Sequence, residues 1–393
     1  MSSKSVAGVN PQILRWAREM VNMKVAQVAS SLKRQPEEIE SWENGVAAPT
    51  YPQLEKLAYN IYKRPLAVFF LPSPPKENLP AKEFRTLPSE ELESLHSDTC
   101  LIIRKAYAYQ LALSEIFDGR NPANRKIWNE ISLSYSGDLA SQAQLIRKQL
   151  GVTLEQQAGW RSAERALRTW RQAVEECGIF VFKAPFKQKE ISGFCLKDDD
   201  FPVIFINNST AKTRQIFSIM HELAHLLLSM NGISKIDSSY IERLPNADRK
   251  LEVFCNSVAA EILIPTQDFM EQAKQFPSNV ERATEEQFSE LAARYGVSRE
   301  AVLRRFLDQG RVSPSFYAEK SSFWTAQQKP KGDGGGGDYY RTQKSYISER
   351  FAGEVISRHY RRQITVEQAA DMLGLKPKQY AGFEEVFLKG VGA

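Results

Sequence analysis

The sequence predicts a mostly helical α+β protein made of several domains. Apolar residues recur at helical spacing, with capping residues, over most of the 393 residues, whereas short β-favouring runs are confined to about residues 179–206. A proline-rich stretch at 71–75 and a glycine-rich stretch at 329–338 interrupt the helical pattern and are typical of linkers. These observations predict five segments, with boundaries at 1–75, 76–176, 177–320, 321–338 and 339–393.

Composition sets limits on compartment and partners. The net charge of +5 and the 25% of charged residues are those of an ordinary soluble protein, and permit nucleic-acid contact without requiring it. The four cysteines are far apart, which argues against a disulfide framework and favours a reducing cytoplasm. No signal peptide is apparent and the longest apolar run, Leu66–Leu71, is too short to span a bilayer, so we expect no membrane partner.

The N-terminal segment predicts a small helical domain. Asn10 and Pro11 mark a helix start, and two short helices follow at Val25–Leu32 and from Pro36 to about Asn44. The residues Gln27, Ala29, Ile39, Trp42-Glu43-Asn44-Gly45 and Pro49 resemble the Xre-type helix-turn-helix family over about residues 10–70.

That resemblance implies binding to operator DNA, with the helix that starts at Pro36 in the major groove. The residues expected to face DNA are Gln35, Glu38, Ser41 and Asn44. The same helix also carries Glu37 and Glu40, whose carboxylates repel phosphates. The alternative is therefore a module for protein docking or for formation of a homodimer.

The segment 76–176 is expected to be a helical connecting region, and short strands follow it. The β-favouring runs lie at 179–182, 193–196 and 203–207, and the last two flank an aspartate-rich turn like a hairpin.

His221-Glu222-Leu223-Ala224-His225 is the motif on which the functional interpretation rests. It lies in an apolar, helix-compatible run from about Thr210 to Met230, so the two imidazoles share one helix face and Glu222 stands beside them. That is the arrangement of zinc hydrolases, in which the glutamate is the general base for a metal-bound water. The alternative is a buried helix whose histidines only hydrogen-bond to the backbone.

A third metal ligand is expected on a second helix, between Asn246 and Pro265. At 100° per residue, Asn256 falls within about 40° of Glu252, whereas Glu261 lies about 180° away. Glu252 is therefore the expected ligand, and Asn256 is placed to hydrogen-bond a ligating histidine and fix its tautomer. Cys255, displaced by about 60°, is the softer alternative ligand.

Three blocks of sequence resemble the ImmA/IrrE family of bacterial zinc metallopeptidases: Arg214–Leu227, Glu252–Asn256 and Ala259–Pro265. The resemblance covers about residues 177–310 and implies a zincin-like core that binds Zn²⁺ through His221, His225 and Glu252, with Glu222 as base. The phenylalanine usual in the family before the Ala-Ala pair is Val258 here.

The resemblance also suggests further parts of the site. An edge strand beside the metal helix would pair with the substrate backbone, and the candidate is Val203, Ile204, Phe205, Ile206 and Asn207. Tyr240, in an expected loop from 231 to 245, is a candidate hydrogen-bond donor to the oxyanion. A two-helix module is expected at 284–310, with Arg299, Arg304 and Arg305 on a solvated face.

The sequence thus predicts a zinc-dependent endopeptidase whose protein substrate is a helix-turn-helix repressor or another regulator, in a phage, mobile-element or stress response. The alternative is a DNA-binding regulator or antitoxin with little proteolytic activity, whose helical extension at 339–393 grips a partner toxin. Val25–Trp42, Phe288–Phe306 and Val366–Phe383 each show a helix, turn, helix pattern, which is too degenerate by itself to prove duplication.

Overall fold

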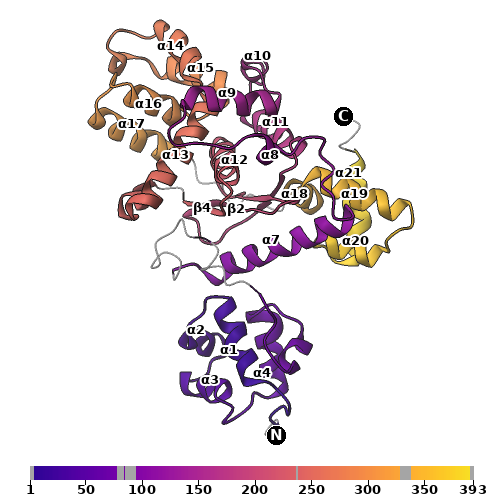
Figure 1. The fold of residues 1–393 in the computed structure, drawn as a ribbon. Helices are drawn as coiled ribbons and strands as arrows, with labels where there is room; N and C mark the ends of the chain where they lie inside the picture. Colours follow the sequence, from indigo (N-terminus) through magenta and orange to yellow (C-terminus); the bar gives the residue numbers. More distant parts are fainter. Residues whose placement is uncertain (1–3, 78–83, 85–93, 236–237, 328–337, 390–393) are drawn as a thin grey trace. The chain divides into compact units, whose positions relative to one another are not determined.

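The computed structural model describes residues 4–77, 84, 94–235, 238–327 and 338–389, and the glycine-rich stretch expected to be a linker lies almost wholly outside them. The chain divides into two compact units. One comprises Met1–Lys105 with Phe186–Lys189, and the other comprises Ala106–Pro185 with Glu190–Ala393 (Figure 1). Within the described parts, none of the helices combines the length and the apolar character that crossing a membrane requires.

The first unit is a small bundle of short helices around one apolar core. Asn10 accepts a hydrogen bond from the Gln12 amide at 3.0 Å and so caps the first helix, in which Pro11 is the first residue. Glu43 is buried and its carboxylate receives the Arg18 guanidinium at 2.7 Å, so a charge in the core is paired. The elements are α1 (Pro11–Met20), α2 (Val25–Leu32), α3 (Pro36–Glu43), α4 (Tyr51–Glu55), the π-helical η1 (Lys56–Ile61) and the 3₁₀ turn η2 (Leu66–Phe70).

Helix α7 (Ser97–Ile116) continues into the second unit, where four helices precede the first strand. These are α8 (Ile127–Glu130), α9 (Leu139–Leu150), α10 (Leu154–Ala158) and α11 (Ala163–Glu176). Trp170 on α11 and Ile146 on α9 belong to the same buried cluster as the helices that follow the strands. The region 106–176 therefore packs as part of the second unit.

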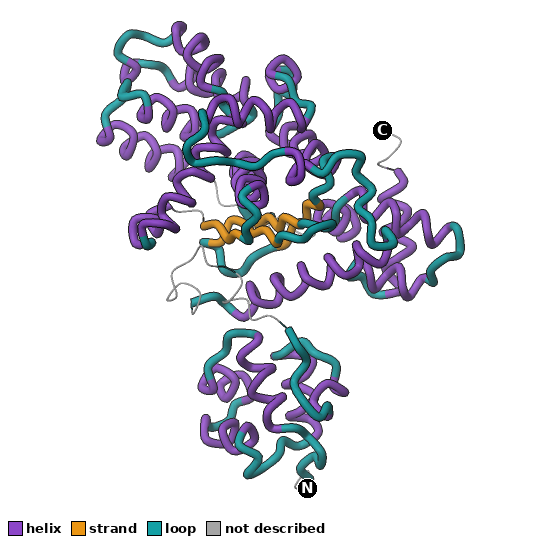
Figure 2. The backbone as a smooth tube through the Cα atoms, viewed as in Figure 1, coloured by secondary structure: helices purple, strands orange, loops and turns teal. Residues whose placement is uncertain are grey.

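The elements from the first strand to residue 327 comprise the sheet, the helices that cover it and the helices that follow (Figure 2). They are β1 (Phe180–Ala184), β2 (Ile191–Leu196), β3 (Val203–Asn207), α12 (Lys212–Leu227), β4 (Gly232–Lys235), η3 (Ser238–Arg243), α13 (Asn246–Leu263), α14 (Thr266–Gln272), η4 (Ala273–Gln275), η5 (Val280–Arg282), α15 (Glu285–Tyr295), α16 (Arg299–Asp308) and α17 (Pro314–Gln327).

The four strands form one mixed sheet in the order β1-β3-β2-β4. Strand β3 pairs in parallel with β1 and antiparallel with β2, so its hydrogen-bonding groups on both sides are used. The expectation that Val203–Asn207 is an edge strand for substrate is therefore wrong. The strand at the edge beside β2 is β4, which the sequence placed inside a loop.

The two faces of the sheet differ in character. One face is aliphatic: Cys195, Ile204 and Ile206 share a core with Ile219 and Leu223 of α12. The other face is aromatic, because the register places Phe182, Phe205 and Phe194 in one row across three strands, with ring centroids 5.2 and 5.1 Å apart. Tyr109 of α7 stacks on the Phe182 ring at 4.3 Å.

The described helices after residue 337 dock on the same unit. They are α18 (Tyr339–Tyr346), α19 (Glu349–Tyr360), α20 (Val366–Met372), η6 (Pro377–Gln379) and α21 (Tyr380–Lys389). Phe351 of α19 packs edge-on against Tyr109 and Phe182. The buried Arg171 guanidinium donates to the carbonyls of Ser345 at 2.9 Å and Ile347 at 2.5 Å, which fixes the C-terminal helices to α11.

Two further expectations need correction. Helix α17 continues to Gln327, so residues 321–327 are helical and are not part of a flexible linker. Arg305 is not solvated: its guanidinium lies 2.6 Å from the buried Glu261 carboxylate and also donates to the Ile264 carbonyl. This ion pair holds the C-terminal end of α13 against α16.

Candidate metal centre

Helices α12 and α13 place the expected metal ligands together. Both helices are buried along the shared face, and His221, Glu222, His225 and Glu252 have at most 2% of their surface exposed. A buried polar side chain is costly unless it has a polar partner. These four side chains must therefore interact with one another or with a bound ion. Their burial is thus the first indication of a built site.

The distances among the ligand atoms fit one metal ion. His221 Nε2 lies 3.1 Å from His225 Nε2, and each of these nitrogens lies 3.3 Å from one Glu252 carboxylate oxygen. Ligands at zinc-bond lengths in a tetrahedron are about 3.3–3.4 Å apart. His221, His225 and Glu252 are therefore placed to hold a metal ion.

Electrostatic interactions also link the three expected ligands to one another. Burial opposes ionisation of Glu252, but the charges and hydrogen bonds of His225 and His221 lower the pKa of its carboxyl. Burial likewise opposes protonation of His225, yet Cys255 and Glu252 raise its pKa well above the ordinary value. Glu252 is thus held as a carboxylate, the form that ligates a cation, whereas His225 must give up its proton to ligate one.

Each ligand is oriented by a neighbour. Asn256 Oδ1 lies 2.9 Å from His221 Nδ1, the contact that the helical spacing suggested, and leaves Nε2 to face the ligand cluster. The Cys255 thiol lies against the His225 ring, outside the group of three ligand atoms. The structure thus gives Cys255 a supporting position rather than a ligating one.

Tyr240 contacts the third ligand directly. Its hydroxyl donates to Glu252 Oε2 at 2.9 Å, and the ring is buried. Burial is the largest cause that raises the pKa of Tyr240, and the negative charge of Glu252 is the second. The phenol therefore stays protonated and remains a donor. The sequence had suggested contact with the oxyanion, whereas in this structure the hydroxyl orients a ligand.

Glu222 lies beside the three expected ligands and is the candidate general base. Its side chain is fully buried, and no described N–H or O–H group donates to either carboxylate oxygen. It also projects from α12 beside the ligands without belonging to the group of three. The Cys195 thiol is a weak hydrogen-bond neighbour of this carboxylate. A carboxylate that no N–H or O–H group engages, next to a cation site, is suited to accept a proton.

The close approach of strand β4 to His225 and Glu222 was not predicted from the sequence. A Cβ atom added to Gly232 would lie 2.6 Å from the Cγ and Cδ2 atoms of His225 and 3.0 Å from Glu222 Oε2. Only glycine lets the β4 backbone come this close. The signal in the sequence was a glycine before the short alternation Ile233, Ser234, Lys235, which is too brief to predict a strand with certainty.

The residues expected to face DNA lie in the first unit, on or beside α3. Gln35 and Asn44 are exposed, and Ser41 is half-buried and donates to the Glu38 carbonyl at 2.7 Å. The Glu38 carboxylate accepts from Gln53 Nε2 at 3.2 Å. These contacts neither require nor exclude a nucleic acid.

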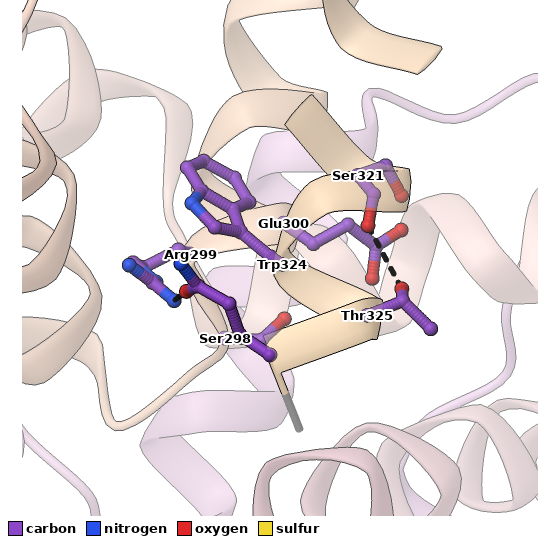
Figure 3. Close-up of a pocket in the computed structure, with 7 residues that line it drawn as sticks. Ser298, Arg299, Glu300, Ser321, Trp324 and Thr325 are labelled. Carbon is purple, nitrogen blue, oxygen red and sulfur yellow. Dashed lines mark hydrogen bonds between the residues drawn. The ribbon is translucent and has the colours of Figure 1, made fainter. Parts of the chain in front are cut away.

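A polar cavity of about 310 Å³ lies between α16 and α17, apart from the metal-binding residues (Figure 3). Arg299 donates to Gln327 and to Glu285, and Thr325 donates to the Ser321 carbonyl. The polar groups here already have protein partners, so the cavity shows no built ligand site.

Comparisons with known proteins agree with the resemblance noted in the sequence. Residues 174–307 match the peptidase M78 model described as the IrrE N-terminal-like domain. A stretch of 124 residues is 33% identical to the radiation response metalloprotease IrrE of Deinococcus radiodurans, covering 31% of this chain and 35% of that protein. The chain thus spans about a third of that relative's length, and the match supports a metallopeptidase-type domain of the ImmA/IrrE kind in this segment.

Proposed function

We propose that this protein is a zinc-dependent endopeptidase that cleaves a regulatory protein. The observation that carries the proposal is the convergence of His221, His225 and Glu252 on one point, with the buried carboxylate of Glu222 beside them and no N–H or O–H donor to it among the described groups. A closed structural zinc site normally has four protein ligands, whereas three ligands leave a position for water. The donor set of two imidazoles and one carboxylate also suits zinc.

When bound, zinc would supply a water of lowered pKa and polarise the scissile carbonyl. In the proposed mechanism, Glu222 takes the proton of that water and then delivers it to the leaving amine. General acid-base catalysis of this kind contributes about 10² to 10⁴ in rate. Asn256 and Tyr240 keep His221 and Glu252 oriented throughout.

We propose that β4, rather than β3, receives the substrate backbone. Among the described strands, β4 lies at one edge of the sheet and has β2 as its neighbour on one side. Gly232 brings this strand against His225 and Glu222, so a peptide paired with its outer edge would run beside the catalytic groups.

The substrate class follows from resemblance. We propose a repressor of the helix-turn-helix type, or another regulator, as the target, with the N-terminal unit being an Xre-type module that places the protease beside it. The spacing of α2 and α3 supports that module, as does the left-handed conformation of Lys33 between them (φ 57°).

The test compares Glu222→Gln with wild type in native host cells, by identifying new protein N-termini before and after DNA damage. Glu222→Gln should retain metal, measured on the purified protein, and lose cleavage. The matched control is Glu242→Gln, which changes an exposed carboxylate two residues after Tyr240 in the sequence. A cleavage site seen with wild type and the control, and absent with Glu222→Gln, supports the proposal. Full cleavage by Glu222→Gln would refute the assigned base.

The competing function is a DNA-binding regulator or antitoxin without proteolysis. It would be favoured if folded, metal-loaded wild type produced no new N-termini under either condition while it bound one operator sequence or a toxin tightly.

A further inference from the structure

The ligands of the candidate metal centre are more accessible on the side of His221 than on the side of His225. Gly232 and Cys255 both lie against His225, and both are buried. Phe217 lies beside His221 and is only half-buried. Among the described residues, the side of His221 is therefore where a peptide can approach the ligands, and Phe217 is a side chain that it would meet there.

The Phe217 ring presents an apolar surface next to a metal ligand. The centres of the Phe217 and His221 rings are 6.3 Å apart, because the two residues are one turn apart on α12. The Phe217 side chain packs against the core of the second unit without being enclosed by it. An apolar side chain that covered the rest of the ring would remove more apolar surface from water, which is favourable.

Arg214 holds the Phe217 ring and the end of β4 in one place. The Arg214 guanidinium carbon lies 5.3 Å from the centre of the Phe217 ring, and Arg214 Nη2 donates to the Lys235 carbonyl at 2.7 Å. Lys235 is the last residue of β4. The ring therefore has a fixed position relative to the strand that we propose as the substrate strand.

Strand β4 and helix α12 run alongside each other past this ring. At one end of the strand, Gly232 lies against His225, and at the other end Lys235 accepts the hydrogen bond from Arg214. Phe217 lies between His225 and Arg214 on the helix, so a peptide paired with the outer edge of β4 would pass the ligands and then Phe217. The 6.3 Å that separates Phe217 from the nearest ligand ring corresponds to about two residues of an extended chain.

We propose that Phe217 determines specificity by packing against a large apolar side chain of the substrate, within two residues of the scissile bond. The inference rests on the proposed function and on β4 as the strand that receives the substrate, and it adds the class of residue that is recognised. A polar side chain at that position would lose water without gaining a hydrogen bond from the ring. The competing explanation is that Phe217 only fills the core, in which case its replacement changes stability and leaves substrate preference as it is.

The first experiment measures binding to the zinc-loaded protein, without turnover. The probes are two pairs of peptide hydroxamates, whose hydroxamate group binds zinc. The peptide lies on the N-terminal side of that group in one pair and on the C-terminal side in the other. Within each pair, the two residues next to the hydroxamate are both leucine or both alanine. By isothermal titration calorimetry, wild type should bind the leucine probe of one pair about tenfold more tightly than its alanine partner.

Three variants test whether that preference depends on Phe217. Phe217→Ala should bind the two probes of the pair alike, whereas Phe217→Trp, which fills the space beside the ring, should favour the alanine probe. The matched control is Phe254→Ala, because Phe254 is another half-buried ring, which follows Glu252 by two residues and packs on Tyr135 at 4.8 Å. This control should keep the wild-type preference. Zinc content and thermal unfolding are measured for each variant, and Phe217→Trp decides the outcome if Phe217→Ala fails to hold zinc.

The inference is overturned if wild type binds neither pair, if it shows no preference for leucine, or if folded, zinc-loaded Phe217→Ala keeps the full preference. Cleavage of peptides that contain the site found in cells tests the proposed function separately. Metal-dependent cleavage whose preference survives Phe217→Ala would leave the peptidase standing and refute the role of Phe217. A leucine preference that depends on Phe217, with no cleavage by wild type, would support the role of Phe217 in binding and refute the peptidase.

Discussion

Replacing Gly232 with alanine tests how closely β4 supports the metal-binding residues. The added methyl carbon would lie 2.6 Å from two ring atoms of His225, where an ordinary contact is at least 3.4 Å. The ring or the strand must therefore move by about 0.8 Å. Displacement of a catalytic group by about 1 Å costs ~10² in rate, and disturbed support of a ligand costs ~10 to 100 in metal affinity. We expect losses of that size in both quantities.

The metal affinity of Gly232→Ala is measured by competition with a chromogenic chelator. Its turnover is measured on a peptide that contains the identified cleavage site. The control is Gly353→Ala, whose new Cβ would meet its nearest neighbour, Phe387, at an ordinary 3.8 Å. Thermal unfolding of both variants separates a local effect from loss of fold. Wild-type metal affinity and turnover in a folded Gly232→Ala protein would refute the close approach of β4.

Three further changes test other parts of the molecule. Tyr240→Phe removes the hydroxyl that donates to Glu252 at 2.9 Å and should weaken metal binding about tenfold, and unchanged chelator competition would contradict this role. Arg171→Met leaves buried carbonyls and a carboxylate without their donor, and should lower the free energy of unfolding by about 3–5 kcal/mol in urea titrations. A loss below ~1 kcal/mol would argue against the role of Arg171 in holding the C-terminal helices to α11. Burial raises the pKa of Asp268, but hydrogen bonds from Arg294 and a neighbouring tyrosine lower it below the ordinary value, so its carboxylate stabilises the fold above about pH 4 and loses that effect as pH falls. Asp268→Asn should therefore cost about 1–2 kcal/mol at pH 7 and less at pH 3, and an equal cost at both would count against the pairing.

Local periodicity was sufficient to predict the candidate metal centre. The spacing of four residues places His221 and His225 on one helix face, and the angular argument selects Glu252 over Glu261 within a single helix. Both inferences depend only on the helix that carries the residues. The structure then shows Glu261 engaged with Arg305, a partner 44 residues away that no periodicity reveals.

The order of the strands could not be predicted in the same way. Val203–Asn207 does form a strand, but its place between β1 and β2 depends on pairings with distant segments. Strand β4 has only four residues and includes a glycine, so its local β propensity is weak. Its position is determined by packing against α12, which is why the edge of the sheet was assigned to the wrong strand.

The aromatic row on the sheet has a consequence for the order of events during synthesis. Phe351 completes the packing around Tyr109 and Phe182, yet it emerges from the ribosome long after them. At 5–20 residues per second, the delay between residues 182 and 351 is roughly 10–30 seconds. The three metal ligands are complete once residue 252 has been made, about 100 residues before Phe351 adds the last of these rings. A fragment released after residue 252 but before α19 is made would therefore retain the ligands, while its aromatic row would lack the contact of Phe351.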